Sequence, residues 1–253
     1  MSALPAAGVL LRRSLNEILR VPGAAIPGIL APSIFMLGLT SVFGGLTELR
    51  HFGTTDYLAF ILPVSLMQAA GFTGAATGVN LARDIEQGWF DRLLVAPVPR
   101  PLLLASIVGS ASLRALLPVV STLLVAFAFG VKFPGAGRLL LALCLVAAFA
   151  AVAATWASAL ALRFKTQSAA PVMQTSMFIL VLFTPSYAPQ QLLSGFMQDV
   201  ARLNPVSKVV EAMRACFVGD VTWAQTWPAL AVLAGLALLF GAFALRGMYR
   251  TGA

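Results

Sequence analysis

The chain has 253 residues, of which 59% are hydrophobic and only 10% are charged. A soluble domain carries about 25% charged residues, so this composition excludes an ordinary water-soluble protein. The mean hydropathy of +0.90 predicts an α-helical protein that crosses a membrane several times. The net charge of +8 does not indicate nucleic-acid binding, because the basic residues are dispersed at the ends of apolar runs.

Residues 9–20 predict an amphipathic helix that lies along the membrane surface. Leu11, Leu15 and Leu19 fall on one helical face, and Arg12 and Glu17 fall on the other. A signal peptide is the competing interpretation, because arginines precede an apolar run. No A-x-A-like cleavage site stands before a polar region, so we expect this segment to be retained.

Six apolar runs are long enough to cross the hydrocarbon of a bilayer. They cover about 22–43, 57–81, 104–129, 139–162, 168–187 and 223–245. Of the 17 Lys and Arg residues, ten lie on the side of both termini, six lie on the other side, and Arg114 falls inside a run. Cytosolic loops carry the excess of Lys and Arg, so we expect both termini in the cytosol and the chain in the plasma membrane.

The second run contains Ala70, Gly74 and Gly78, a repeated small-xxx-small spacing. Small residues let helix backbones approach closely in lipid, so this spacing predicts a packing face or a dimer seam. A substrate groove is the less favoured alternative. No internal repeat or linker divides the chain, and we expect one domain over residues 1–253.

The sequence offers no constellation of catalytic residues. It lacks a G-x-x-x-x-G-K-[ST] phosphate loop, and none of its three lysines follows a glycine. The one histidine, His51, lies in a short loop, and Cys144 and Cys216 lack metal-ligand spacing. We therefore expect no catalytic residue, no metal and no cofactor bound by this chain.

Residues 84–100 form a charged, amphipathic island between apolar runs, on the predicted cytosolic side. A helix over about 84–96 places Ile85, Trp89 and Leu93 at i, i+4 and i+8, in one apolar stripe, with acidic residues on another face. Pro97 ends this helix before the chain re-enters the membrane. An ordinary solvated loop helix is the alternative, but it leaves an exposed Trp-Phe pair unexplained.

The island, D-x-E-x-G-W-F-D-R-L-L-V-A-P-V-P-R, resembles the cytosolic motif of ABC-2-type transporter permeases, particularly the daunorubicin-resistance type of drug exporters. In that family this segment is a coupling helix that docks into a cleft of a cytosolic ATPase subunit. Trp89 stands where many members carry a small polar residue. The residues that the resemblance assigns to ATPase coupling are Asp84, Glu86, Gly88, Trp89, Asp91, Arg92, Leu93 and Pro97.

Two further segments are similar to that family. Residues 19–45 look like its first span, and residues 204–219 look like its signature between spans five and six, which lies on the extracytoplasmic side in short helices that dip back into the membrane. We expect such a hairpin over about 188–220, with a helix starting near a proline and a Lys208–Glu211 pair on its polar side. The signature residues are Asn204, Pro205, Glu211, Arg214 and Gly219.

A few polar residues fall inside the predicted spans. A charge near mid-bilayer costs at least about 2.5–3.5 kcal/mol, so we expect Arg114 to line a polar path or to form an internal ion pair. The alternative is that span three starts late and the Arg114 side chain snorkels to the cytosolic interface. Gln68, Asn80 and Gln174 are further candidates for lining a path. Hydrogen bonding between helices explains these three equally well.

The resemblance implies an all-α, six-span permease of an ATP-driven exporter that moves an amphipathic drug, antibiotic or lipid-like compound. It also implies two copies of an ABC ATPase, which hold ATP and Mg, a second or related permease, and surrounding membrane lipid. The alternatives are a stand-alone secondary transporter driven by an ion gradient and a membrane-embedded enzyme. Every Asp and Glu is predicted to lie outside the spans, which disfavours the secondary transporter.

Overall fold

The computed structural model describes residues 22–49, 52–90 and 98–251, which contain helices and turns and no strand. The predicted helix at residues 9–20 lies outside this part of the chain. The long helices are α2 (Pro22–Phe43), α3 (Tyr57–Glu86), α5 (Arg100–Ala128), α6 (Ala136–Phe164) and α10 (Trp223–Thr251). The short elements are η1 (Gly44–Glu48), η2 (Gln167–Ala169), α7 (Ala170–Leu182), η3 (Gln190–Leu192), α8 (Gly195–Leu203) and α9 (Val206–Val218).

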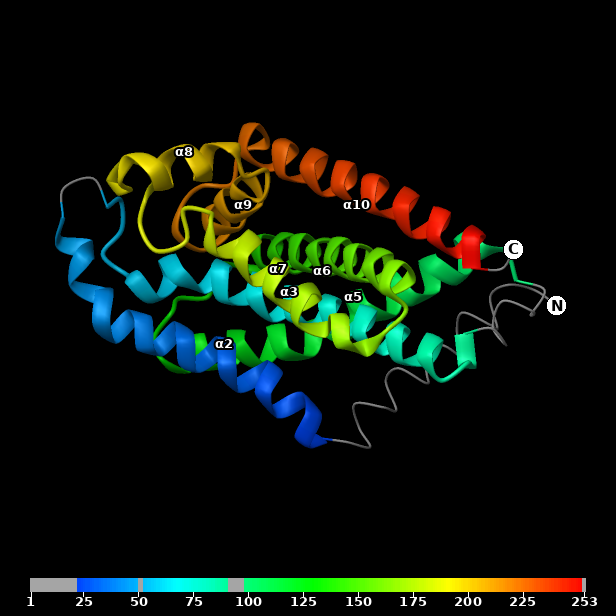
Figure 1. The fold of residues 1–253 in the computed structure, drawn as a ribbon. Coiled ribbons are helices and arrows are strands. Elements are labelled where there is room, and N and C mark those ends of the chain that lie inside the picture. Colours follow the sequence, from blue (N-terminus) through cyan, green and yellow to red (C-terminus); the bar gives the residue numbers. More distant parts are fainter. Residues whose placement is uncertain (1–21, 50–51, 91–97, 252–253) are drawn as a thin grey trace.

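The long helices run side by side and give the molecule two ends (Figure 1). At the island end, α3, α6 and α10 finish and α5 begins, and the Arg100 guanidinium donates to the Met248 carbonyl oxygen at 2.9 Å. At the opposite, hairpin end, which also carries α8, α9 contacts α3, and the Tyr57 hydroxyl at the start of α3 donates to the Tyr187 carbonyl oxygen at 3.0 Å. Residues 188–220, where a helical hairpin was predicted, contain η3, α8 and α9 and lie at the end opposite the island.

Helix α3 is the central element of the bundle and contacts α2, α5, α6, α7 and α9. Its most apolar stretch is 89% buried, whereas those of α2 and α10 are 17% buried. The Asp56 carboxylate caps its first turn by accepting from the Ala59 N–H at 3.0 Å. A long helix of this burial has little contact with the surroundings, whereas α2 and α10 present most of their surface outward.

The small-xxx-small spacing on α3 is a packing face within one chain, and the dimer-seam and groove interpretations are wrong for these residues. A Cβ atom added at Gly74 would lie 2.6 Å from the Ala153 Cβ and 2.7 Å from the Ala150 carbonyl oxygen. One added at Gly78 would overlap Ala157. Glycine is therefore required at both positions for α3 and α6 to pack backbone to backbone.

Five of the six predicted spans match helices that are long and apolar enough to cross a membrane. The fifth run, predicted over 168–187, forms the shorter segment Gln167–Leu182 instead. Its end has a local cause. Pro185 disfavours a helical conformation at Thr184, and the Thr184 and Ser186 hydroxyls donate to the Val181 carbonyl oxygen at 2.7 and 2.8 Å.

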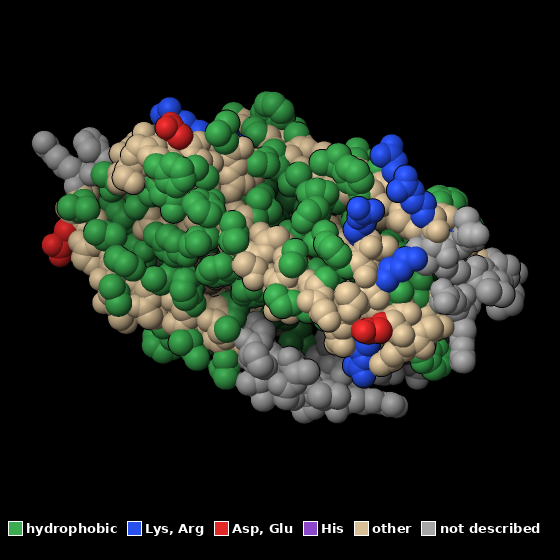
Figure 2. All heavy atoms as spheres, viewed as in Figure 1, with side chains coloured by type: hydrophobic (Ala, Val, Ile, Leu, Met, Phe, Trp, Pro, Cys, Tyr) green, Lys and Arg blue, Asp and Glu red, His purple; other side chains and the backbone are tan. Residues whose placement is uncertain are grey.

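The surface separates apolar from charged side chains (Figure 2). Hydrophobic side chains cover the middle of the bundle, and most Lys and Arg side chains on the visible face gather at the island end. Large apolar side chains remain exposed along the outer helices, among them Leu238 at 76% and Ile34 at 63%. Such a surface is stable in lipid but not in water, so this is a multi-pass membrane protein.

Candidate functional site

The start of the island does not form the continuous helix that the sequence predicted. Asp84 and Glu86 belong to the last turn of α3, which ends there because Gly88 adopts a φ of +74°, a conformation that favours glycine. A helix continuous from residue 84 is therefore wrong, and so is the stripe that joined Ile85 to Trp89. Trp89 starts a new helical segment and is 52% exposed, while Phe90 is buried.

Four predicted coupling residues, Asp91, Arg92, Leu93 and Pro97, lie outside the described residues. The other four, Asp84, Glu86, Gly88 and Trp89, lie together at the island end.

Glu86 connects the island to α7. Its Oε2 accepts a hydrogen bond of 3.2 Å from the backbone N–H of Gln167, the first residue of η2, which leads directly into α7. The first N–H groups of a helix have no partner within it, and a carboxylate is favoured there by the helix dipole. The sequence separation of 81 residues hides this contact from any local pattern.

Asn204 binds the other end of α7, as Glu86 binds its start. Its Nδ2 donates to the carbonyl oxygens of Leu180 at 2.7 Å and Phe183 at 3.0 Å. Its Oδ1 accepts from the Val206 N–H at 3.0 Å, in the first turn of α9. One amide thus satisfies the last carbonyls of α7 and begins α9, which explains why a side chain with both a donor and an acceptor stands before Pro205.

Arg214 joins α9 to α3 and to the segment after α7. Its Nε donates to the Phe60 carbonyl oxygen at 3.3 Å, its Nη2 donates to the Pro185 carbonyl oxygen at 2.7 Å, and its guanidinium lies 3.7 Å from the centre of the Phe60 ring. Burial lowers the pKa of Arg214 to about 10, and the Coulombic effect of Glu211 opposes that shift. The side chain therefore remains a cation at neutral pH.

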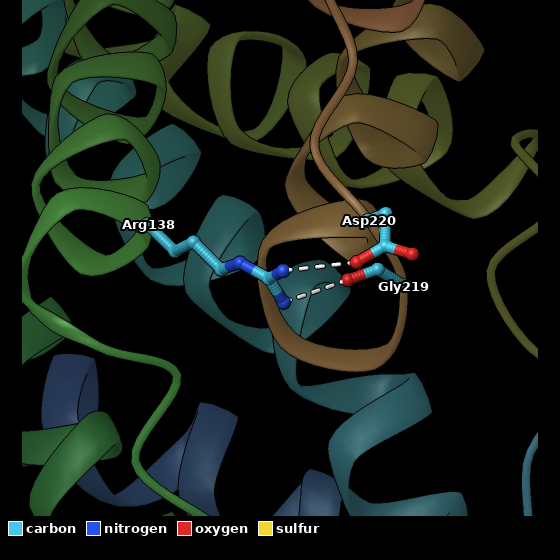
Figure 3. Close-up of polar contacts among 3 residues, drawn as sticks. All are labelled: Arg138, Gly219 and Asp220. Carbon is cyan, nitrogen blue, oxygen red and sulfur yellow. Dashed lines mark hydrogen bonds and ion pairs between the residues drawn. The ribbon is translucent and has the colours of Figure 1, made fainter.

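The remaining signature residues lie around Arg214 at the hairpin end. Glu211 accepts from Lys208 at 3.0 Å, which confirms the predicted pair. The carbonyl oxygen of Gly219 and the carboxylate of Asp220 accept from Arg138 of α6 at 2.8 and 3.0 Å (Figure 3). The signature is thus a structural junction of α3, α6, α7 and α9.

Arg114 lies in the middle of α5, because the helix begins at Arg100. The helix thus starts earlier than the predicted span, while snorkelling of Arg114 to the cytosolic interface stays a prediction, because helix bounds do not define the edge of the bilayer. Arg114 Nη2 donates to the Thr77 hydroxyl of α3 at 2.7 Å, so the cation faces protein. Its place between two spans agrees with a polar contact inside the bundle.

The three uncharged candidates for a path lie in different environments. Gln68 is buried on α3, Asn80 is half-buried on α3, and Gln174 is exposed on α7. They do not form one lining. Gln174 faces outward from a helix whose buried residues are Met173, Met177 and Val181, so it is available to a neighbour or to a passing ligand.

Sequence reasoning missed the contacts by which Trp156 of α6 holds α7 and α10. The Trp156 indole N–H donates to the Ser176 hydroxyl at 2.9 Å, and the Trp156 ring lies 4.9 Å from that of Phe240. A lone tryptophan in an apolar run gives no signal for such a partner. The described residues contain no group of three His, Cys, Asp or Glu side chains that could hold a metal ion.

Two comparisons with known proteins agree with this architecture of a multi-pass membrane transport protein. The model of the ABC-2 type transporter family matches residues 6–218, and the chain belongs to that family. It is 29% identical over 241 residues to the daunorubicin resistance ABC transporter permease protein DrrB1 of Streptomyces coeruleorubidus, covering 94% of this chain and 83% of that protein. It is 26% identical over 212 residues to a protein of Cyanophora paradoxa named as a transport permease, ycf38, covering 81% of this chain and 72% of the relative.

Proposed function

We propose that this chain is the membrane-spanning subunit of an ATP-driven exporter, working with two copies of a cytosolic ABC ATPase and with a second permease subunit. ATP and Mg bind to the ATPase, and the permease supplies the route. Family membership and the similarity to a drug-resistance permease support an amphipathic drug, antibiotic or lipid-like compound as cargo. The island end faces the cytosol in this proposal, with both termini on the same side and α7 as the short fifth span.

The observation that carries the proposal is the attachment of α7 at both ends. The last turn of α3, where the island begins, holds its start through Glu86, and the signature holds its finish through Asn204. The two segments that resemble the family's coupling helix and signature are thus joined by one short helix. A displacement of the island is transmitted along α7, because a helix is stiff along its axis, and reaches the hairpin end through Asn204 and α9.

The mechanism follows from these contacts. Closure of the ATPase subunits on ATP pushes the island, and the island moves the last turn of α3 and the start of α7 together. Since α3 and α6 are locked by Gly74 and Gly78, they move as one body. Helices α7 and α9 then shift relative to that body, which opens an outward or lateral route for cargo. The approach of α3 to α7 is looser, because a Cβ atom added at Gly71 would lie 3.7 Å from the Met177 Cβ, an ordinary contact distance, so α7 is the freer element.

The test uses the permease reconstituted with its ATPase in proteoliposomes. We expect Glu86→Ala to lower substrate-stimulated ATP hydrolysis and ATP-dependent export about three- to tenfold, while the complex still assembles. Glu48→Ala is the matched control, because Glu48 is an exposed glutamate in η1 at the other end of the bundle. Unchanged coupling in Glu86→Ala with intact assembly contradicts the transmission path. Export driven by a proton gradient without ATP contradicts the proposed function as a whole.

A further inference from the structure

A hollow of about 400 Å³ opens at the hairpin end, away from the island and from α7's attachment to it. Its walls come from the start of α3, the segment after α7, helix α9 and the residues just before and within the first turn of α10. Phe52, Phe60 and Pro185 supply apolar surface, and Glu211, Arg214 and Asp220 supply charge. This volume lies within the range of small-ligand sites, about 300–1,000 Å³.

The cation of the hollow is Arg214. Its Nε and Nη2 are occupied by backbone carbonyl oxygens, whereas its Nη1 makes no hydrogen bond to any described residue. The Phe60 ring covers one face of the guanidinium. These contacts fix the orientation of the group, so that its remaining N–H groups are available to an oxyanion such as a phosphate.

Two carboxylates stand beside this cation. Glu211 lies three residues before Arg214 on α9, which places both side chains on one helical face. Asp220 lies at the rim, where Arg138 holds it (Figure 3). The ion pairs of Glu211 with Lys208 and of Asp220 with Arg138 are partly exposed and weak, so both carboxylates can accept a further donor. A wall with one guanidinium and two carboxylates disfavours an anion and suits a zwitterion.

The surroundings of the hollow are those of a membrane interface. Trp223 and Trp227, at the start of α10, are 73% and 52% exposed, and they flank Gln225, which lines the hollow. Exposed tryptophans concentrate at the level of lipid headgroups. On the neighbouring α8, Phe196 and Leu203 are also exposed, at 74% and 84%. A ligand here therefore meets an apolar surface immediately outside the hollow, as an acyl chain requires.

We propose that this hollow binds the headgroup of a phosphatidylethanolamine-type lipid, with the phosphate on Arg214 and the primary ammonium near Glu211 and Asp220. In ethanolamine phosphate the two charges are separated by two carbons and an ester oxygen, a short link that suits side chains one helical turn apart. A choline headgroup has no N–H to donate to the carboxylates, and a glycerol headgroup has no cation. The headgroup chemistry does not depend on coupling to an ATPase. The hollow lies at the end opposite the island, so the orientation proposed above places this lipid in the outer leaflet.

The test is native mass spectrometry of the delipidated full chain in detergent, titrated with dioleoyl phosphatidylethanolamine, phosphatidylcholine and phosphatidylglycerol. We expect phosphatidylethanolamine to bind at least about fivefold more tightly than the other two. Glu211→Gln should remove most of that preference, and Arg214→Lys should weaken the binding of all three phospholipids. Glu48→Gln, at the same end of the bundle but outside the hollow, should leave the preference unchanged.

Thermal melting of each variant in the same detergent separates binding from folding. Glu211 is a partly exposed residue, so Glu211→Gln is expected to melt within a few degrees of the wild-type chain. Equal binding of the three lipids overturns the proposal. So does a full phosphatidylethanolamine preference in folded Glu211→Gln. Competition of inorganic phosphate with the lipid at equal concentration would also overturn it, because it would show a simple phosphate site.

Discussion

Replacing Asn204 by alanine should destabilise the junction between α7 and α9. The substitution removes three hydrogen bonds, of 2.7, 3.0 and 3.0 Å, and leaves the carbonyl oxygens of Leu180 and Phe183 without their side-chain donor. A buried polar group that loses its partner costs about 1–3 kcal/mol. Both carbonyls belong to half-buried residues, so the lower part of that range applies to each, and we expect a total loss of about 2–3 kcal/mol.

The measurement is thermal unfolding of the purified chain in detergent, followed by intrinsic fluorescence. A loss of this size corresponds to a fall in melting temperature of about 4–12 °C for a chain of this length. Asn80→Ala is the matched control, because Asn80 is half-buried on α3 and makes no described side-chain hydrogen bond. Equal melting temperatures for the two variants would refute the reasoning that Asn204 carries the end of α7.

Two further experiments test the packing of the bundle. Gly78→Ala should destabilise the chain by about 1–3 kcal/mol, because its new methyl group overlaps Ala157, whereas Gly109→Ala, with open space around its added Cβ atom, should be neutral or slightly stabilising in the same melting assay. Trp156→Phe should cost about 1 kcal/mol through loss of the bond to Ser176, and the double variant with Ser176→Ala should lose less than the sum of the two single losses. Strict additivity in that cycle would mean that the two side chains do not interact.

The apolar runs predicted most of the long helices to within a few residues, because a span needs about 20 apolar residues whatever its neighbours are. The prediction failed at the island. Whether Gly88 continues a helix or ends it depends on the direction that the chain must take after α3, and a helical periodicity contains no information about that direction. The length of the fifth helix was also mispredicted, because Pro185 acts through the conformation of Thr184, the residue before it.

The contacts around α7 were beyond sequence reasoning for a different reason. Glu86 and Gln167 are 81 residues apart, and Asn204 reaches carbonyls 21 and 24 residues earlier. The family resemblance indicated Glu86 and Asn204 as functional residues, but it did not indicate the hydrogen-bond partner of either side chain. Their partners are backbone atoms, which any residue supplies, so no side-chain pattern points to them. Arg114 likewise has its partner, Thr77, on another helix and 37 residues earlier in the chain.

The most direct test of the central claim is affinity purification of the tagged chain from native membranes under gentle conditions, followed by mass identification of its companions. The account predicts that a cytosolic ATPase with a Walker A motif co-purifies. It also predicts that this ATPase is lost when residues 84–94 are scrambled but retained when residues 195–203, which form α8 at the other end of the bundle, are scrambled. A folded chain that purifies without any ATPase would contradict the claim that ATP hydrolysis by a separate subunit drives this permease.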